Sequence, residues 1–373
     1  MYSYFRRLIV VLSILVVCSG CTASPSEPRG YTPNSTEVAA QPSTMPDFNI
    51  STVALQCTNY IETTWGAGPG EFGLCPASSE QMGRPYPPVP DAQGNLFILD
   101  RVNQRILQYS ESTTPQVIPI PSSYIFSDPC SYSMRGLSNL GVNGGRLFLH
   151  FPAYRDERLV EHLAVLSPDG QEERIISLEA YYPVYPRSAP VADGDGGSYL
   201  LLPLLGTVYF DTNFRPEFIS TGADEMDSGG LVIGWDGNLY TYSSGHDHLT
   251  NWGIGNDLFR RGAEPVNSKT NVLSATQTAS STLKRLLGVD AQGQFYFVLE
   301  THEQDAIGCQ FVRLSASGDK IAIAIVPDRI LDDGALSSFS LAPDGSLYGM
   351  SYGLAEPDPS VNPRVVKCVF KQD

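Results

Sequence analysis

The chain has 373 residues, with 40 acidic against 24 basic side chains and a formal net charge of −16. An acidic surface repels nucleic acid and anionic lipid headgroups at long range, so we expect no nucleic-acid partner. The length leaves room for one large hydrophobic core.

The N-terminus has the features of an export signal. A pair of arginines precedes the apolar run 8–17, which is too short to span a bilayer. The run ends in Val17-Cys18-Ser19-Gly20-Cys21, which resembles the lipobox of bacterial lipoproteins, except that Cys18 stands where leucine is usual. The resemblance implies that the signal peptide 1–20 is removed and that Cys21 is lipidated. An ordinary cleaved signal peptide is the alternative, and in both cases the protein lies outside the cytoplasm, in the cell envelope.

Two further regions follow the signal. Residues 21–49 contain five prolines among Ser, Thr and Glu, a composition that predicts an extended, disordered linker behind the lipid anchor. Such a linker reaches roughly 30 Å. No charge run or proline-rich break divides residues 50–373, which we interpret as one folded domain.

A repeated turn gives the fold class. An aspartate, a glycine and then an alternating strand recur along the domain, and the glycine supplies the positive φ that a tight turn requires. The turn glycines are Gly94, Gly145, Gly197, Gly237, Gly293 and Gly345. The intervals between them each accommodate four short strands, which predicts an all-β, six-bladed β-propeller of four-stranded antiparallel blades. We expect the turn aspartates to accept backbone N–H bonds: Asp91, Asp195, Asp236, Asp290 and Asp344.

One interval shows a complete blade. Its expected strands are residues 286–289, 294–300, 310–314 and 320–326. The last blade has three strands, ending with 364–370, so we expect the N-terminal segment 50–56 to supply its fourth strand and close the ring.

The closing strand predicts a disulfide. Cys57 would then lie on a strand paired with the one that carries Cys368, and a Cys57–Cys368 bond would lock the ring. Cys75–Cys130 is a second candidate pair. No Cys-x-x-Cys spacing indicates a structural zinc site.

The first blade carries a family resemblance. Residues 65–72 (WGAGPGEF), 88–100 (PVPDAQGNLFILD) and 103–106 (NQRI) look like an NHL repeat. In the other blades only the turn and its strand are similar. The resemblance implies a six-bladed propeller, a fold that serves both scaffolds and enzymes, so it does not name a function.

The histidines suggest a metal site. His246 and His302 each lie nine residues after a turn glycine, and we expect both in loops between the second and third strands of neighbouring blades. With Asp305 nearby, these side chains would suit a divalent metal. The alternative is a chance spacing in polar loops. We interpret His150 and His162 as strand-end and surface residues, and we expect no other cofactor.

Aromatic and basic side chains mark the expected contact surface. The stretch 243–282 lacks a clear strand pattern and carries Trp252, Phe259, Arg260 and Arg261, while Tyr181 and Tyr182 form a second cluster. Aromatics and arginine are the usual anchors of binding surfaces. The alternative for the tyrosines is that they cover the edge of a blade.

These features favour a non-catalytic function. We expect a monomeric, lipid-anchored, extracytoplasmic propeller that binds a protein, peptide or glycan partner or acts as a scaffold. The sequence contains no nucleophile elbow and no phosphate-binding glycine loop. The alternative is a metal-dependent hydrolase or lyase at the mouth of the propeller channel, so whether the protein is an enzyme stays open.

Overall fold

The computed structural model describes most of residues 49–373. The described residues are 49–75, 85, 87–110, 114–124, 139–143, 145–155, 158–178, 191–192, 198–202, 206–211, 213, 215–219, 231–243, 248–253, 267–270, 281–303, 306–317, 320–325, 339–352 and 360–371. Their regular elements are strands, apart from one 3-10 turn, η1 (Ser122–Tyr124). No helix in this part of the chain is long and apolar enough to span a membrane.

The described strands form six sheets, of which the first four are four-stranded antiparallel meanders. The first sheet contains β3 (Val89–Pro90), β4 (Leu96–Asp100), β5 (Arg105–Tyr109) and β6 (Gln116–Pro119). The second contains β7 (Asn139–Asn143), β8 (Arg146–Arg155), β9 (Arg158–Leu166) and β10 (Glu172–Ser177). The third contains β11 (Val191–Ala192), β12 (Ser198–Leu202), β13 (Gly206–Phe210) and β14 (Pro216–Ile219). The fourth contains β15 (Leu231–Ile233), β16 (Leu239–Ser243), β17 (His248–Gly253) and β18 (Asn267–Thr270).

The last two sheets each include a strand from the start of the domain. The fifth contains β19 (Ser281–Val289), β20 (Phe295–Glu303), β21 (Ala306–Leu314), β22 (Lys320–Ile325) and β1 (Asn49–Thr52). The sixth contains β23 (Phe339–Leu341), β24 (Leu347–Ser351), β25 (Arg364–Phe370) and β2 (Leu55–Glu62). The strands expected at 286–289, 294–300, 310–314, 320–326 and 364–370 are therefore confirmed to within a few residues.

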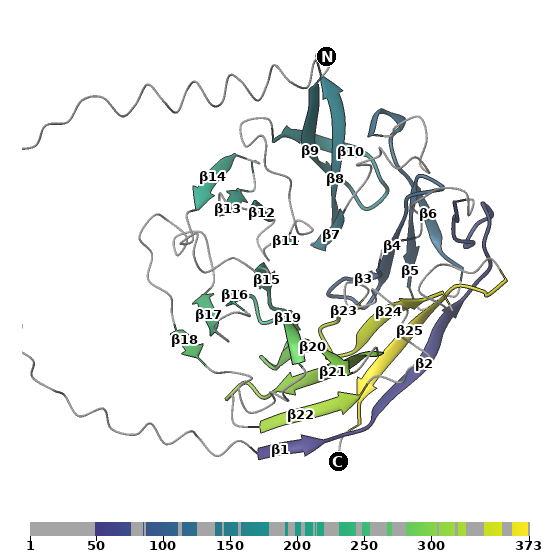
Figure 1. Ribbon diagram of the computed structural model, residues 1–373. Coiled ribbons are helices and arrows are strands. Elements are labelled where there is room, and N and C mark those ends of the chain that lie inside the picture. Colours follow the sequence, from purple (N-terminus) through teal and green to yellow (C-terminus); the bar gives the residue numbers. More distant parts are fainter. Residues whose placement is uncertain are drawn as a thin grey trace, which may run out of the picture. The chain divides into compact units, whose positions relative to one another are not determined.

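The sheets lie in a propeller arrangement (Figure 1). The first strand of each sheet contacts the first strand of the next, in the order β3, β7, β11, β15, β19 and β23. The succession returns to its start, because β23 contacts β3. The predicted all-β propeller with antiparallel sheets is confirmed.

The repeated turn has the predicted geometry wherever it is described. Gly94, Gly145, Gly237, Gly293 and Gly345 all have positive φ. Asp91 Oδ1 accepts the N–H groups of Gln93 and Asn95 at 2.9 and 2.8 Å. Equivalent bonds to the aspartate two residues earlier come from the N–H groups of Asn238, Gln292 and Ser346. Asp195 and Gly197 lie outside the described residues.

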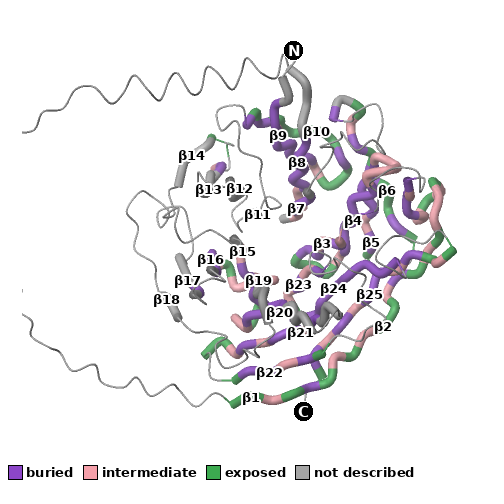
Figure 2. The backbone as a smooth tube through the Cα atoms, in the orientation of Figure 1, coloured by how far each residue is buried: buried purple, intermediate pink, exposed green. Residues whose placement is uncertain are grey.

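The apolar core lies between neighbouring sheets. The cluster between the fifth and sixth sheets contains Phe311 and Phe339, and the cluster between the sixth and first contains Phe72 and Leu107. Every residue of β4 and β24 is buried, whereas β1 is exposed along most of its length (Figure 2). Burial on both faces of the central strands is what stacking of sheets requires.

The fourth strand of the sixth sheet comes from the N-terminal side of the domain, as predicted, although it spans Leu55–Glu62 and not 50–56. β2 supplies the fourth strand of the sixth sheet and pairs antiparallel with β25. Residues 49–52 form the separate strand β1, which pairs parallel with β22 at the outer edge of the fifth sheet. The prediction missed this because both halves of the segment have β propensity, and only the assembled sheets decide which edge each half meets.

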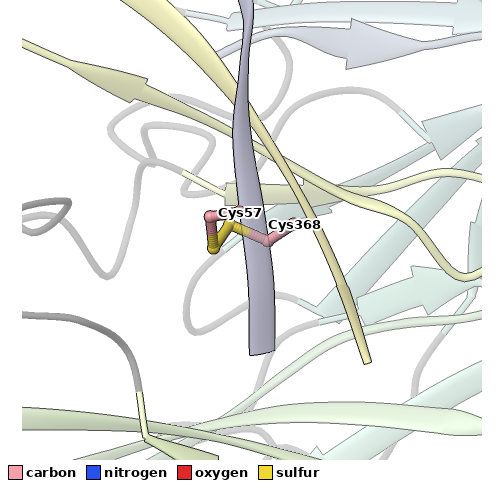
Figure 3. The surroundings of a disulfide bond; sticks show 2 residues. All are labelled: Cys57 and Cys368. Carbon is pink, nitrogen blue, oxygen red and sulfur yellow. A yellow bond between two sulfur atoms is a disulfide. The ribbon is translucent and has the colours of Figure 1, made fainter. Parts of the chain in front are cut away.

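The Cys57–Cys368 disulfide is present (Figure 3). The two cysteines face each other in the register of β2 and β25, with Cα atoms 4.1 Å apart and a sequence separation of 311. Cys75 is also disulfide-bonded. Cys130, the partner predicted for it, lies outside the described residues, so that pairing stays a prediction.

Removing the Cys57–Cys368 bond should destabilise the domain. The C57S/C368S double variant is expected to lose about 2–5 kcal/mol of unfolding free energy, because the bond closes a very long loop and restricts the unfolded chain. Denaturant unfolding of both proteins under oxidising conditions measures the difference. Equal midpoints and slopes would show that the strand pairing alone closes the ring.

Candidate functional site

The meander topology gives the propeller two different faces. We call turn face the side on which the first and second strands of each sheet, and the third and fourth strands of the first five sheets, are joined. The loop face is the other side, on which the second and third strands are joined and the chain passes to the next sheet. The passages at the loop face are long: 63–88, 120–138, 178–190, 220–230, 271–280 and 326–338. The turn-face connections are short, such as 91–95 and 290–294, with the exception of 254–266.

A buried ion pair anchors the first of the long passages. Arg105 at the start of β5 and Asp100 at the end of β4 lie with Nε and Oδ2 3.1 Å apart, and both side chains are buried. The guanidinium also donates to the carbonyl oxygens of Ala67, Gly68 and Glu71, at 2.7 to 3.1 Å. One cation therefore fixes the backbone of the passage to the first sheet.

Asp100 completes the anchor from the other side. Its Oδ1 accepts the N–H groups of Gly73 and Asn103, and its Oδ2 accepts Asn103 Nδ2 at 2.7 Å. A Cβ atom at Gly73 would lie 2.8 Å from Asp100 Oδ1, so only glycine allows this approach. Buried charges are stable only when they are paired and fully hydrogen-bonded, and this pair meets both conditions.

Aromatic packing ties the same passage to the sixth sheet. The Trp65 ring stacks on Tyr352 with centroids 5.7 Å apart, and the indole Nε1 donates to the carbonyl oxygen of Val361. The Tyr352 hydroxyl donates to the carbonyl oxygen of Pro85. The described part of the passage is therefore held by the first and sixth sheets together, which gives the loop face a rigid base at this point.

The Tyr109 hydroxyl is a further, uncharged donor to the backbone of the same passage. Burial raises its pKa to about 12, and the Asp100 charge adds to the rise while the Arg105 charge opposes it. The hydroxyl therefore keeps its proton throughout the physiological range and donates to the carbonyl oxygen of Gly70 at 3.4 Å.

The second sheet holds a buried histidine–glutamate pair. His150 Nε2 in β8 lies 2.9 Å from Glu161 Oε2 in β9, and the two side chains are 5% and 7% exposed. On the opposite side of the hairpin, His162 stacks on Phe151, which in turn stacks on Tyr124. His150 is thus a buried residue in the middle of a strand, and the interpretation of it as a strand-end residue was wrong.

The predicted metal ligands are not described as a set. His246 and Asp305 lie outside the described residues. His302 is in β20, opposite Ile307 of β21, and not in a loop, so the expected shared loop position is wrong for this residue. Within the described ranges no three His, Cys, Asp or Glu side chains are grouped as metal ligands would be. The metal site stays a prediction.

The predicted contact residues are described only in part. The stretch 243–282 is not strand-free, because it contains β17 and β18, and Trp252 lies in β17. The other predicted contact residues lie outside the described ones, so their part in a contact surface stays a prediction: Phe259, Arg260, Arg261, Tyr181 and Tyr182.

The two buried pairs, Asp100–Arg105 and His150–Glu161, differ in how far the sequence could have predicted them. The Asp100–Arg105 pair lies in the motif region that resembled an NHL repeat, although its role as an anchor required the structure. The His150–Glu161 pair had no signal, since eleven positions separate the two residues and their meeting depends on the register of the β8–β9 hairpin.

The fold and this site define a β-propeller with a rigid base and long passages on one face. No family model matches the sequence, and no curated protein matches it. Among solved structures, luciferin-regenerating enzyme is 14% identical, with 78% of this chain and 93% of that chain covered and a TM-score of 0.45. A streptogramin B lyase is 10% identical, with 85% of this chain and 98% of that chain covered and a TM-score of 0.44. YCF48 bound to D1 peptide is 9% identical, with 87% of this chain and 99% of that chain covered and a TM-score of 0.39. At these TM-scores the similarities carry no argument about the site.

Removing the Arg105 side chain should loosen the anchored passage. Arg105→Ala removes the cation that pairs with the buried Asp100 carboxylate and one donor to each of three carbonyl groups, and we expect a loss of about 3–5 kcal/mol of unfolding free energy. Arg105→Lys retains the charge but not the fork of donors, so it should recover only part of the loss. Thermal and denaturant unfolding measure both.

The matched control is Arg146→Ala. Arg146 pairs with Glu173 at 2.9 Å, but both side chains are about a third exposed, so the cost should be below about 1 kcal/mol. Similar losses for Arg105→Ala and Arg146→Ala would contradict the anchoring role.

Proposed function

We propose that this protein is an exported, lipid-anchored, six-bladed β-propeller that binds a protein, peptide or glycan partner at its loop face. The observation that carries the proposal is the difference between the faces. Long passages join every pair of consecutive sheets at the loop face, whereas the turn face is made largely of short connections with satisfied aspartates. Long connections on a rigid scaffold are where binding residues usually lie.

Six blades are supported by the succession of first strands. Each of the six sheets contributes one strand to it, and the contact of β23 with β3 closes it. Adjacent turns are also joined directly, because Trp235 N–H donates to Val289 O and Ala291 N–H donates to Pro343 O. The NHL-repeat resemblance of the first blade belongs to this part of the proposal.

A binding function suits the rigidity of the domain. The base of the loop face is held by the buried Asp100–Arg105 pair and the ring by the Cys57–Cys368 bond. A preorganised surface loses less conformational entropy on binding than a mobile one. The proposal includes a monomer in the cell envelope, attached to a membrane through Cys21 and the linker.

The anchor has a direct test. Cys21→Ser should convert a membrane-associated protein into one released from the membrane, because a lipobox cysteine carries the acyl chains. Detergent phase partition and intact mass of the purified full-length proteins measure this. An unacylated wild-type chain that begins after the signal would remove the anchor from the proposal and leave the binding face unaffected.

The loop face is tested by comparing substitutions in the two predicted contact clusters. A photo-crosslinking residue at position 181 or 182 identifies the partner, and Y181A/Y182A should then weaken its binding at least tenfold, about 1.4 kcal/mol. F259A/R260A changes the other predicted contact cluster, between β17 and β18 in the sequence. A loss of affinity with F259A/R260A and none with Y181A/Y182A would contradict the proposed contact at the loop face.

A further inference from the structure

The two cysteines of the Cys57–Cys368 disulfide have different surroundings. Cys368 is 0% exposed and lies in β25, which is paired on one side with β24 and on the other with β2. Cys57 is half-buried in β2, the outer edge strand of the sixth sheet. Its neighbours along the strand, Gln56 and Thr58, are exposed. A reagent in solution therefore approaches the Cys57 side of the bond more readily than the Cys368 side.

The surroundings of Cys368 are apolar. It belongs to the cluster between the fifth and sixth sheets, together with Leu347, Val366 and Phe370. In thiol–disulfide exchange, one sulfur is attacked by a thiolate and the other sulfur leaves as a thiolate. A thiolate that leaves at Cys368 would be a charge among apolar side chains, which costs free energy unless the charge is paired.

These two features together protect the closed bond. Attack on the more accessible sulfur, Cys57 Sγ, expels the buried Cys368 thiolate. Attack on Cys368 Sγ would expel the half-exposed Cys57 thiolate, but there the attacked sulfur is the buried one. Each route of reduction therefore meets one obstacle for as long as β2 stays paired with β25.

Formation of the bond begins at the thiol that an oxidant reaches first. The two cysteines are 311 residues apart in sequence, and they face each other only when β2 has paired with β25. Cys57 lies on the strand with a free edge, whereas Cys368 lies on a strand between two others. In the paired ring before oxidation, the reachable thiol is therefore that of Cys57.

We propose that Cys57 is the exchange cysteine of this domain and Cys368 the resolving cysteine, with a thiol–disulfide oxidant of the surrounding compartment as the partner. The Cys57 thiolate attacks a sulfur of the oxidant's disulfide, forms a mixed disulfide and releases one thiolate of the oxidant. The Cys368 thiolate then attacks Cys57 Sγ and expels the second thiolate of the oxidant. The domain loses two electrons and two protons, and the oxidant's disulfide becomes two thiols.

Only the source of the oxidant rests on the export proposed above, since an oxidising compartment supplies it. The assignment of the two cysteines rests on burial and strand order, and its test uses glutathione disulfide with the purified full-length chain. A failed assignment therefore leaves the proposed export unaffected, and a cytoplasmic protein would leave the assignment unaffected.

The test compares two single variants, each of which keeps one thiol of the pair. In folded Cys368→Ser the glutathione adduct at Cys57 should form faster, by about tenfold or more, than the adduct at Cys368 in folded Cys57→Ser. Peptide mass spectrometry after alkylation of the remaining thiols locates and counts the adducts. In denaturant the two rates should agree within about twofold, which separates the effect of burial from the intrinsic reactivity of the two thiols.

Equal rates in the folded variants, or a faster adduct at Cys368, would overturn the assignment. If either variant does not fold, the wild-type chain decides. It is reduced in denaturant, refolded and mixed with glutathione disulfide, and the reaction is quenched before the bond closes. The transient adduct is expected at Cys57, and an adduct mainly at Cys368 would overturn the proposal as well.

Discussion

The pairing of β2 with β25 is the contact on which the rest of the structure depends. A ring of sheets is closed only if its last sheet is complete. Here the strand that completes the last sheet, β2, comes from the opposite end of the chain from β25. Half of the eight β2 residues are exposed, whereas Ile61 is buried and Leu55, Cys57 and Tyr60 pack against the core clusters. The covalent bond at Cys57 adds to this pairing.

With the ring closed, rigidity is concentrated where the chain passes from the sixth sheet to the first. The Trp65 stack and the Arg105 cation both act on this passage, and both connect groups that are distant in sequence. Burying the Asp100–Arg105 pair has a desolvation cost, which the donors and acceptors around both charges offset. The described part of the passage 63–88 is therefore held rigidly at the loop face.

The same topology explains why the candidate site was only partly predictable. Aromatic and basic residues could be recognised along the sequence. The face on which a connection begins and ends, however, depends on which two strands of a sheet it joins, and this is known only from the sheet topology. His302 was expected in a loop because it lies nine residues after its turn glycine. It lies in a strand because β20 is longer than the corresponding strand of the first sheet, β4.

The sequence by itself determined the features that depend on neighbouring residues. Positive φ at Gly94 and Gly293, the aspartate acceptors of the turns and the alternation of the strands are local, because each requires only a few consecutive positions. The disulfide could also be derived, since closing the ring demands that the two ends pair. The tertiary structure alone decided that residues 49–52 leave the closing strand for β22, and that His150 meets Glu161 in the interior. Both depend on edges and registers that exist only after distant strands have assembled.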